Sequence, residues 1–322
     1  MRSFFTTRRT GNLRGTLSLA LVALLSVPAR IGAQQGSAAN DPDRSIKVNV
    51  DLVVLHVTVT DPKGKPFLGL KAENFRLLDN DTEQSLQHFS TQDLPFSMGL
   101  LLDRSGSMSM MIEEVYQAAF HTIRASKPAD EFFIATFSEA FQVRQDFSHD
   151  RDLLQKRLKD ITADGATALY DSILTAVKLV ESGKHDKKAL LVVTDGADNR
   201  SKVPFRELLE LVQRENVSIY AVGLFGNGLL YLEDRRTIAE LTQLAEVTGG
   251  KAYFPRTMKE CDEACIAIAK ELRQQYSLGY YPTPRMRDGA WHSVRLELQP
   301  PPEFSGKGIT ARTRAGYFAP RN

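Results

Sequence analysis

Cysteine is nearly absent from this chain of 322 residues, which contains only Cys261 and Cys265. Two cysteines cannot form the disulfide framework of a small secreted scaffold, and by themselves they do not make a zinc site. They lie four residues apart on a helical stripe, 258–272, that predicts a core-facing seam. From the sequence, free buried thiols and a strained disulfide both remain open.

Several catalytic motifs are also absent. The six histidines occur singly, so the chain has no His-Glu-x-x-His motif of the zinc proteases. Neither the Gly-x-Ser-x-Gly elbow of serine hydrolases nor the Gly-x-x-x-x-Gly-Lys-Ser/Thr loop of P-loop enzymes is present. We therefore expect a protein that is not an enzyme, and keep a metal-dependent hydrolase as the less favoured alternative.

The chain has no long hydrophobic run. The apolar stretch at 16–27 is too short for a membrane span, follows four arginines and precedes small residues up to Ala33. This order is typical of a cleavable signal peptide, which we expect at residues 1–33, with cleavage after Ala29 as the alternative. We therefore expect an exported protein, periplasmic or extracellular at the cell surface, with no stable membrane span after cleavage.

Neither sign of charge dominates, since 41 Lys and Arg face 39 Asp and Glu. Residues 1–33 hold five Arg and no acidic residue, so their removal leaves 36 basic against 39 acidic residues, a net charge of −3. The mature chain thus has no basic excess to bind nucleic acid, and we expect no nucleic-acid partner. The pair Arg8-Arg9 leaves twin-arginine export open beside the general secretory route.

Between residues 94 and 276, strand-like and helix-like segments alternate. Short apolar runs predict strands at 98–102, 131–137, 141–146, 189–194, 217–223 and 251–254. Helical periodicity predicts helices at 108–125, 150–159, 168–181, 204–214, 234–248 and 257–275. This alternation indicates an α/β domain with a doubly wound, mostly parallel sheet and helices on both faces. The strand at 141–146 follows its predecessor closely, and we expect it to be an antiparallel edge.

The flanking segments 45–93 and 277–320 are rich in β-like sequence. Strands are predicted at 46–60, 68–78, 84–89, 276–281, 291–299 and 309–314, with a hairpin turn at Asn80-Asp81. Neither segment has enough strands to be stable alone. We therefore expect both to form one small β-sandwich, discontinuous in sequence, with the α/β domain inserted between its strands. Residues 34–44, which are polar and small, predict a flexible linker.

Oxygen-bearing side chains follow the first predicted strand of the α/β domain. Asp103, Ser105 and Ser107 occupy one short loop between strand and helix, where open α/β sheets place ligands. Helix capping alone could explain the Asp and Ser residues. Two further segments, 164–171 and 188–196, however, end or begin elements at the same predicted sheet edge. Hard oxygen donors gathered there suit Mg²⁺ or Mn²⁺.

These three segments resemble the metal-ion-dependent adhesion site (MIDAS) of the von Willebrand factor type A family. Carried over position by position, the matching residues are Asp103, Ser105 and Ser107 in the first loop, Thr167 in the second and Asp195 in the third. The resemblance covers about residues 96–276, so the domain of this family would occupy 94–276. The order of the flanking elements is similar to a group of exported bacterial proteins that carry this domain.

The resemblance implies a site that holds Mg²⁺ or Mn²⁺ and accepts a Glu or Asp from a protein partner at an open coordination position. The leading interpretation is therefore an exported, metal-dependent protein-binding or adhesion module. A structural envelope component, whose metal only stabilises the fold, is the main alternative. Asp164, Asp171 and Arg104 lie at the predicted rim, and Asp198 is expected to form a turn rather than to support the metal.

Overall fold

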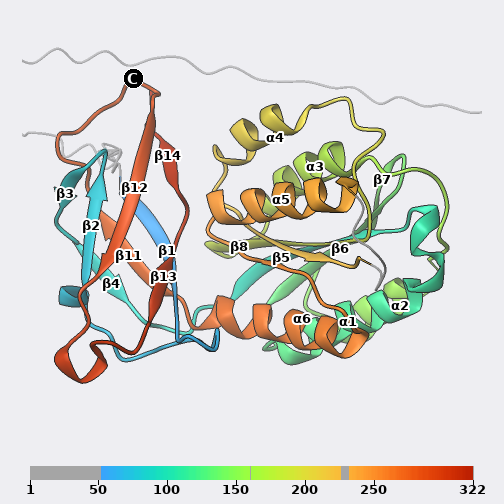
Figure 1. The fold of residues 1–322 in the computed structure, drawn as a ribbon, viewed down its shortest axis with the longest axis horizontal. Coiled ribbons are helices and arrows are strands. Elements are labelled where there is room, and N and C mark those ends of the chain that lie inside the picture. Colours follow the sequence, from blue (N-terminus) through green and yellow to red (C-terminus); the bar gives the residue numbers. More distant parts are fainter. Residues whose placement is uncertain (1–51, 160, 226–231, 322) are drawn as a thin grey trace, which may run out of the picture. The chain divides into compact units, whose positions relative to one another are not determined.

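The computed structural model describes residues 52–159, 161–225 and 232–321, which all belong to one compact unit, Val50–Asn322 (Figure 1). The predicted signal peptide at 1–33, the linker at 34–44 and the start of the first predicted strand lie outside the described residues. In the part of the chain that is described, no helix has the length and apolar character needed to cross a lipid bilayer.

A six-stranded sheet forms the centre of the α/β part. Its strands are β5 (Phe96–Asp103), β6 (Glu131–Phe137), β7 (Phe141–Ser148), β8 (Lys187–Thr194), β9 (Ser218–Gly223) and β10 (Ala252–Tyr253). They lie in the order β10-β9-β8-β5-β6-β7, and all neighbours are parallel except β6 and β7. Strand β5 is buried along its whole length and contains the apolar run 98–102, as expected for a central parallel strand. The predicted antiparallel edge is confirmed in β7.

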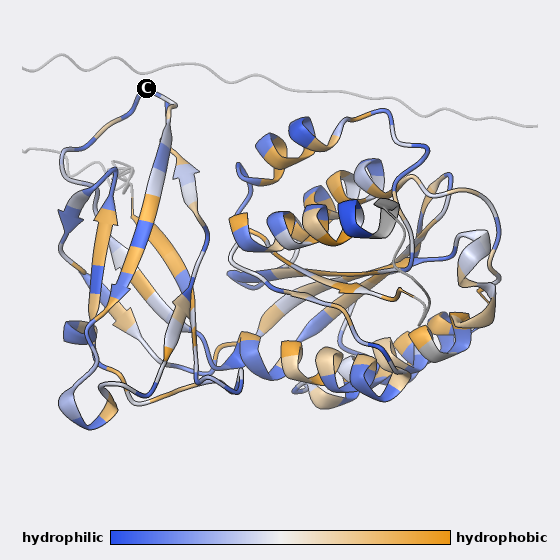
Figure 2. Ribbon diagram, viewed as in Figure 1, coloured by the Kyte–Doolittle hydropathy of each residue, from blue (hydrophilic) through white to orange (hydrophobic). Residues whose placement is uncertain are grey.

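Helices cover both faces of this sheet (Figure 1). They are α1 (Ile112–Ala125), α2 (Arg151–Leu158), α3 (Leu169–Glu181), α4 (Phe205–Val212), α5 (Leu232–Val247) and α6 (Met258–Arg273). One apolar core joins α1, α2 and α6 to the sheet, and a second joins α3, α4 and α5 to the opposite face. Figure 2 shows the apolar residues concentrated in the strands between these layers. The doubly wound architecture predicted from the alternation is confirmed.

The two flanking segments form two antiparallel sheets. Their strands are β1 (Val53–Thr60), β2 (Phe75–Asp79), β3 (Thr82–Gln84), β4 (His88–Ser90), β11 (Tyr276–Tyr280), β12 (Trp291–Leu298), β13 (Thr310–Arg312) and β14 (Gly316–Phe318). The orders are β13-β1-β11-β4 and β14-β12-β2-β3, so each sheet mixes strands from both ends of the chain. A shared apolar core that includes Phe75 and Tyr276 packs the two sheets as a β-sandwich. Asn80 and Asp81 have φ of 46° and 62° and form the predicted hairpin turn between β2 and β3.

Several local expectations differ from the structure. The strand predicted at 84–89 is interrupted, because β3 ends at Gln84 and β4 begins at His88. The helix predicted at 108–125 begins as a 3-10 helix, Gly106–Met110, because Met111 leaves helical geometry with φ −127° and ψ 1°. The strand predicted at 68–78 is limited to β2, which is preceded by the 3-10 helix Ala72–Asn74. Strand β14 was not predicted, since three residues are too few to show an alternating pattern. A further 3-10 helix, Pro302–Phe304, lies between β12 and β13.

The cysteines and the chain junction complete the fold. Cys261 and Cys265 are buried on α6 as free thiols, so they form no disulfide with each other.

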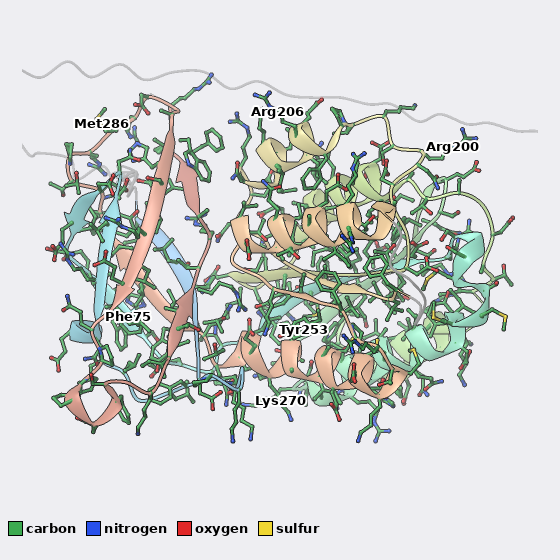
Figure 3. All side chains as sticks on the ribbon, viewed as in Figure 1. Phe75, Arg200, Arg206, Tyr253, Lys270 and Met286 are labelled. Carbon is green, nitrogen blue, oxygen red and sulfur yellow. The ribbon has the colours of Figure 1, made fainter. Side chains whose placement is uncertain are left out.

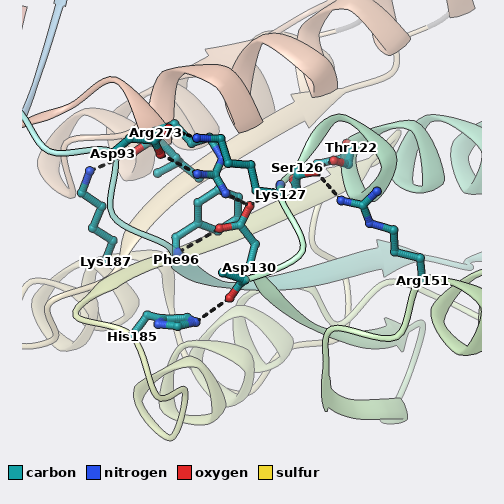
Figure 4. Close-up of polar contacts among 12 residues, drawn as sticks. Asp93, Phe96, Thr122, Ser126, Lys127, Asp130, Arg151, His185, Lys187 and Arg273 are labelled. Carbon is teal, nitrogen blue, oxygen red and sulfur yellow. Dashed lines mark hydrogen bonds and ion pairs between the residues drawn. The ribbon is translucent and has the colours of Figure 1, made fainter.

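At the start of β5 and the end of α6, where the chain enters and leaves the α/β part, Arg273 bonds to both Asp93 and Asp130 (Figure 4). Asp130 also accepts the backbone N–H of Phe96. Both crossings therefore lie at the amino end of the parallel strands.

Candidate metal site

Backbone hydrogen bonds hold the three predicted loops together at the carboxyl ends of β5 and β8. The N–H of Gly106 donates to the carbonyl of Gly165 at 2.9 Å, and the N–H of Asp164 donates to the carbonyl of Arg104 at 2.8 Å. The second and third loops are tied by the N–H of Asn199, which donates to the carbonyl of Thr167 at 3.0 Å. The loops are thus fixed by the main chain, and their side chains are positioned before any ligand arrives.

Four of the five predicted site residues form one hydrogen-bonded chain. The Ser105 and Ser107 hydroxyl oxygens lie 3.1 Å apart, and Ser107 Oγ donates to Asp195 Oδ1 at 2.8 Å. Asp103 Oδ1 accepts the backbone N–H of Ser105 at 2.7 Å. The hydroxyls of Ser105 and Ser107 therefore do not serve as conventional helix caps, because they point to each other and to the third loop.

The fifth predicted residue, Thr167, lies beside this chain. Its side chain is buried, and it lines the same cavity as Ser107. The backbone N–H of Thr167 donates to Asn199 Oδ1 at 2.9 Å, which fixes the residue directly before α3. All five predicted residues are thus brought to one edge of the sheet, with three hydroxyls and two carboxylates.

The two carboxylates are held in unfavourable surroundings for negative charge. Asp103 is 0% exposed, and burial raises the pKa of its carboxyl although Thr194 and Ser105 donate hydrogen bonds to it. Burial also raises the pKa of Asp195 to about 6, and the nearby charge of Asp103 adds to the effect, against the hydrogen bond from Ser107. No Lys or Arg of the described residues forms an ion pair with either carboxylate. Buried charges without a partner are costly.

This donor set suits a small divalent cation. Mg²⁺ and Mn²⁺ prefer carboxylate and hydroxyl oxygens, and a cation would supply the positive charge that the two carboxylates lack. Three neutral hydroxyls and two carboxylates leave part of an octahedral shell for water or an exchangeable ligand. The residues present therefore match a divalent metal in chemistry and in charge.

A cavity of about 280 Å³ opens next to these residues. Ser107, Thr167 and Gly196 form its side towards the site, and Tyr170, Arg236 and Glu240 form another part of the wall. Tyr170 Oη donates to Glu240 Oε2 at 2.6 Å, while Arg236 Nε donates to Glu240 Oε1 at 2.8 Å. The site thus faces a recess large enough for a side chain of a bound partner.

Comparison with known sequences matches one part of the chain to a family. Residues 98–197 match the von Willebrand factor type A domain, and this range contains all five predicted site residues. The chain contains a von Willebrand factor type A domain. A search of the curated proteins found no match to the chain.

Three solved structures illustrate what the chain is similar to. A protein described as von Willebrand factor type A from Catenulispora acidiphila is 11% identical, with a TM-score of 0.49, over 86% of this chain and 76% of that one. BatB from Bacteroides thetaiotaomicron is 13% identical, with a TM-score of 0.46, over 55% and 98%. The von Willebrand domain of the type V pili tip protein Mfa5 from Porphyromonas gingivalis is 9% identical, with a TM-score of 0.46, over 55% and 94%.

Three residues that support the site in this von Willebrand factor type A domain were not predicted from the sequence. Thr194 Oγ1 donates to Asp103 Oδ2 at 2.5 Å and so fixes the second oxygen of that carboxylate. Asn199 holds Thr167 as described above. Tyr170 forms the wall of the cavity. Thr194 directly precedes Asp195 at the end of a largely apolar strand. This single polar residue was the sequence signal from which its role could have been predicted.

The rim residues have mainly structural contacts. Asp198 Oδ1 accepts the N–H groups of Leu169 at 2.8 Å and Tyr170 at 3.3 Å, so it caps α3, whose own preceding residue is alanine. Asp171 accepts the N–H groups of Lys202 and Val203, both at 3.0 Å. Asp198 therefore stabilises the start of α3, where the sequence predicted only a turn, while Asp164 remains exposed.

Proposed function

We propose that this protein is an exported, divalent-metal-dependent protein-binding module of the adhesion type. Asp103, Ser105, Ser107, Thr167 and Asp195 would hold Mg²⁺ or Mn²⁺, and an Asp or Glu of a protein partner would take the open coordination position. The observation that carries this proposal is that the buried Asp103 and the partly buried Asp195 form no ion pair with a described Lys or Arg, while three hydroxyls lie beside them.

The surrounding residues explain how such a site would work. Asp103 is fixed at both oxygens, by the Ser105 N–H and by Thr194, so it presents a defined carboxylate. Ser107 holds Asp195 in place. When bound, the metal supplies a positive charge that neither the loops nor α3 provide. A partner carboxylate is then attracted by a cation in a partly dry recess, where electrostatic interactions are stronger than in water.

Calorimetric titration of Mg²⁺ and Mn²⁺ into metal-free mature protein tests the metal site. We expect saturable binding at one site, which Asp103→Ala abolishes. Asp164→Asn is the matched control, because it removes an exposed carboxylate from the neighbouring loop and should leave the affinity unchanged. Absence of metal binding, or equal binding by Asp103→Ala, would overturn the proposal.

Partner binding separates this function from a purely structural metal. The mature protein is applied to an immobilised array of peptides with and without Asp or Glu, first with Mg²⁺ and then with a chelator. It should bind only to the acidic peptides, and only when Mg²⁺ is present. Asp195→Asn should lose this binding and keep its circular dichroism spectrum. If Asp195→Asn instead loses the fold, the structural envelope role is supported.

A further inference from the structure

A second cavity, of about 240 Å³, lies at the start of β1 and beside β14 in the β-sandwich. The apolar part of its wall includes Leu52, Pro282, Met286 and Phe318. Met286 lies in the loop between β11 and β12 and is 45% exposed (Figure 3). This cavity is separate from the cavity beside the candidate metal site, because the two share no lining residue.

Three arginines from different segments line the same cavity: Arg214 after α4, Arg285 between β11 and β12, and Arg314 between β13 and β14. Among the described residues, neither Asp nor Glu lines it. We call it the arginine cavity. A recess that combines apolar side chains with the cations of Arg214 and Arg314 is matched to a negatively charged ligand with an apolar part.

Arg314 shows this charge imbalance most clearly. Burial lowers the pKa of its guanidinium, and only the tyrosines Tyr280 and Tyr317 act against that shift. Its Nη2 donates to the Val54 carbonyl at a long 3.4 Å, and its Nε is buried without a hydrogen-bond partner in the described structure. Because arginine stays protonated in proteins, Arg314 carries a half-buried positive charge that forms no ion pair with an acid of the described residues.

Arg214 is already held in a binding orientation. Its guanidinium lies over the ring of Phe318, at 4.0 Å from the ring centroid. Stacking of this kind fixes the plane of the group and leaves its N–H edge free to form two parallel hydrogen bonds with a carboxylate. The apolar ring thus orients the charged group at the cavity.

We propose that the arginine cavity binds a small amphiphilic carboxylate, with its head group at Arg214 and Arg314 and its apolar body against Met286 and Pro282. The volume of about 240 Å³ equals that of about eight waters at ~30 Å³ each, enough for a ligand of roughly that number of heavy atoms. A medium-chain fatty acid and the last residue of a peptide, with its free terminal carboxylate, share this chemistry. The proposal does not depend on the metal site.

Titration of octanoate into the mature protein in the presence of a metal chelator tests the proposal. We expect saturable binding of octanoate. Octanamide, which lacks the negative charge, and acetate, which lacks the apolar chain, should each bind at least 10-fold more weakly. A short peptide ending in phenylalanine, with a free or an amidated carboxyl, forms the second arm. Tighter binding of octanoate or of the peptide with a free carboxyl identifies the source of the carboxylate, and either result supports a carboxylate site in the arginine cavity.

The variants Arg214→Gln and Arg314→Lys should each weaken octanoate binding at least 10-fold. Arg214 is exposed, so its substitution tests the cavity even if the Arg314 variant fails to fold. Arg206→Gln is the matched control, because Arg206 lies on α4 with 92% of its side chain exposed and does not line the cavity. Equal affinity for octanoate and octanamide, or full affinity in Arg214→Gln, would overturn the proposal. Absence of octanoate and peptide binding would also overturn it.

Discussion

Replacing Asp195 by Asn should stabilise the metal-free protein while abolishing metal binding. The pKa of Asp195 is about 6 in the folded protein, against an ordinary value of 3.8. Between these two pH values the folded state holds a proton that the unfolded state has released. The free energy of unfolding therefore falls as pH rises through this window and stays low above it. Asn carries no charge, so the variant escapes this loss.

The magnitude follows from the size of the shift. A difference of about 2 pKa units corresponds to about 3 kcal/mol at neutral pH. Asp195 is only partly buried, and Asn replaces a good hydrogen-bond acceptor for Ser107 with a weaker one. We therefore expect a net gain of about 1–2 kcal/mol in the free energy of unfolding. For a domain of this size, that gain raises the Tm by about 2–8 °C.

Thermal unfolding in a chelator at pH 4.5 and pH 7.5 measures this effect. Asp195→Asn should gain most at pH 7.5 and little at pH 4.5, whereas Asp164→Asn should change little at either pH. With Mg²⁺ at 100 times its Kd, the wild type should gain about 2.7 kcal/mol and the Asn variant nothing, which reverses their order. A metal-free Asn variant that unfolds at a lower temperature than the wild type at pH 7.5 would refute the reasoning.

Three other predictions concern the fold and export. Arg273→Met should lower the free energy of unfolding by about 2–4 kcal/mol, because it leaves the fully buried Asp130 without its cation; urea denaturation showing less than 1 kcal/mol would contradict this. Gly250→Ala should cost at least about 3 kcal/mol by the same assay, since a Cβ there would lie 1.9 Å from the Ile219 carbonyl oxygen, and a wild-type midpoint would show that the backbone moves. Intact-mass measurement of exported protein should find an N-terminus at Gln34; a chain that keeps residues 1–33 would disprove signal cleavage.

Apolar patterning was sufficient to predict the α/β part, because each central strand is a short run buried on both faces. The predicted strand 131–137 coincides with β6, and the predicted helix 257–275 extends beyond α6 by one residue at its start and two at its end. Thr257, just before α6, accepts the N–H of Glu260 through its side chain and ends the extended segment there. Local sequence and final structure agree wherever a segment buries one continuous face.

The features of the site that the sequence did not predict depend on contacts between residues far apart in the chain. Asp198 caps a helix that begins 29 residues before it in the chain, through its bond to Leu169. Thr194 holds Asp103 across 91 residues. The first turn after β5 is a 3-10 helix, and there Ser107 bonds to Asp195 rather than to its own helix. No local pattern can show such partners, because the same residue types at a loop are equally compatible with ordinary capping.

The contacts of the other buried Asp and Glu side chains in this protein give the strongest argument for a bound metal. Among the described residues, five Asp and Glu side chains are buried, and four of them contact a basic group: Asp79 with His292, Asp130 with Arg273, Glu131 with Lys184, and Glu271 with Arg312. Asp103, which is 0% exposed, is the exception, and the partly buried Asp195 lies beside it. The fold thus gives each of its other buried acids a basic contact and leaves Asp103 without one at the carboxyl end of β5. Since an unpaired buried charge lowers stability, this exception is consistent with a cation that the chain itself does not supply.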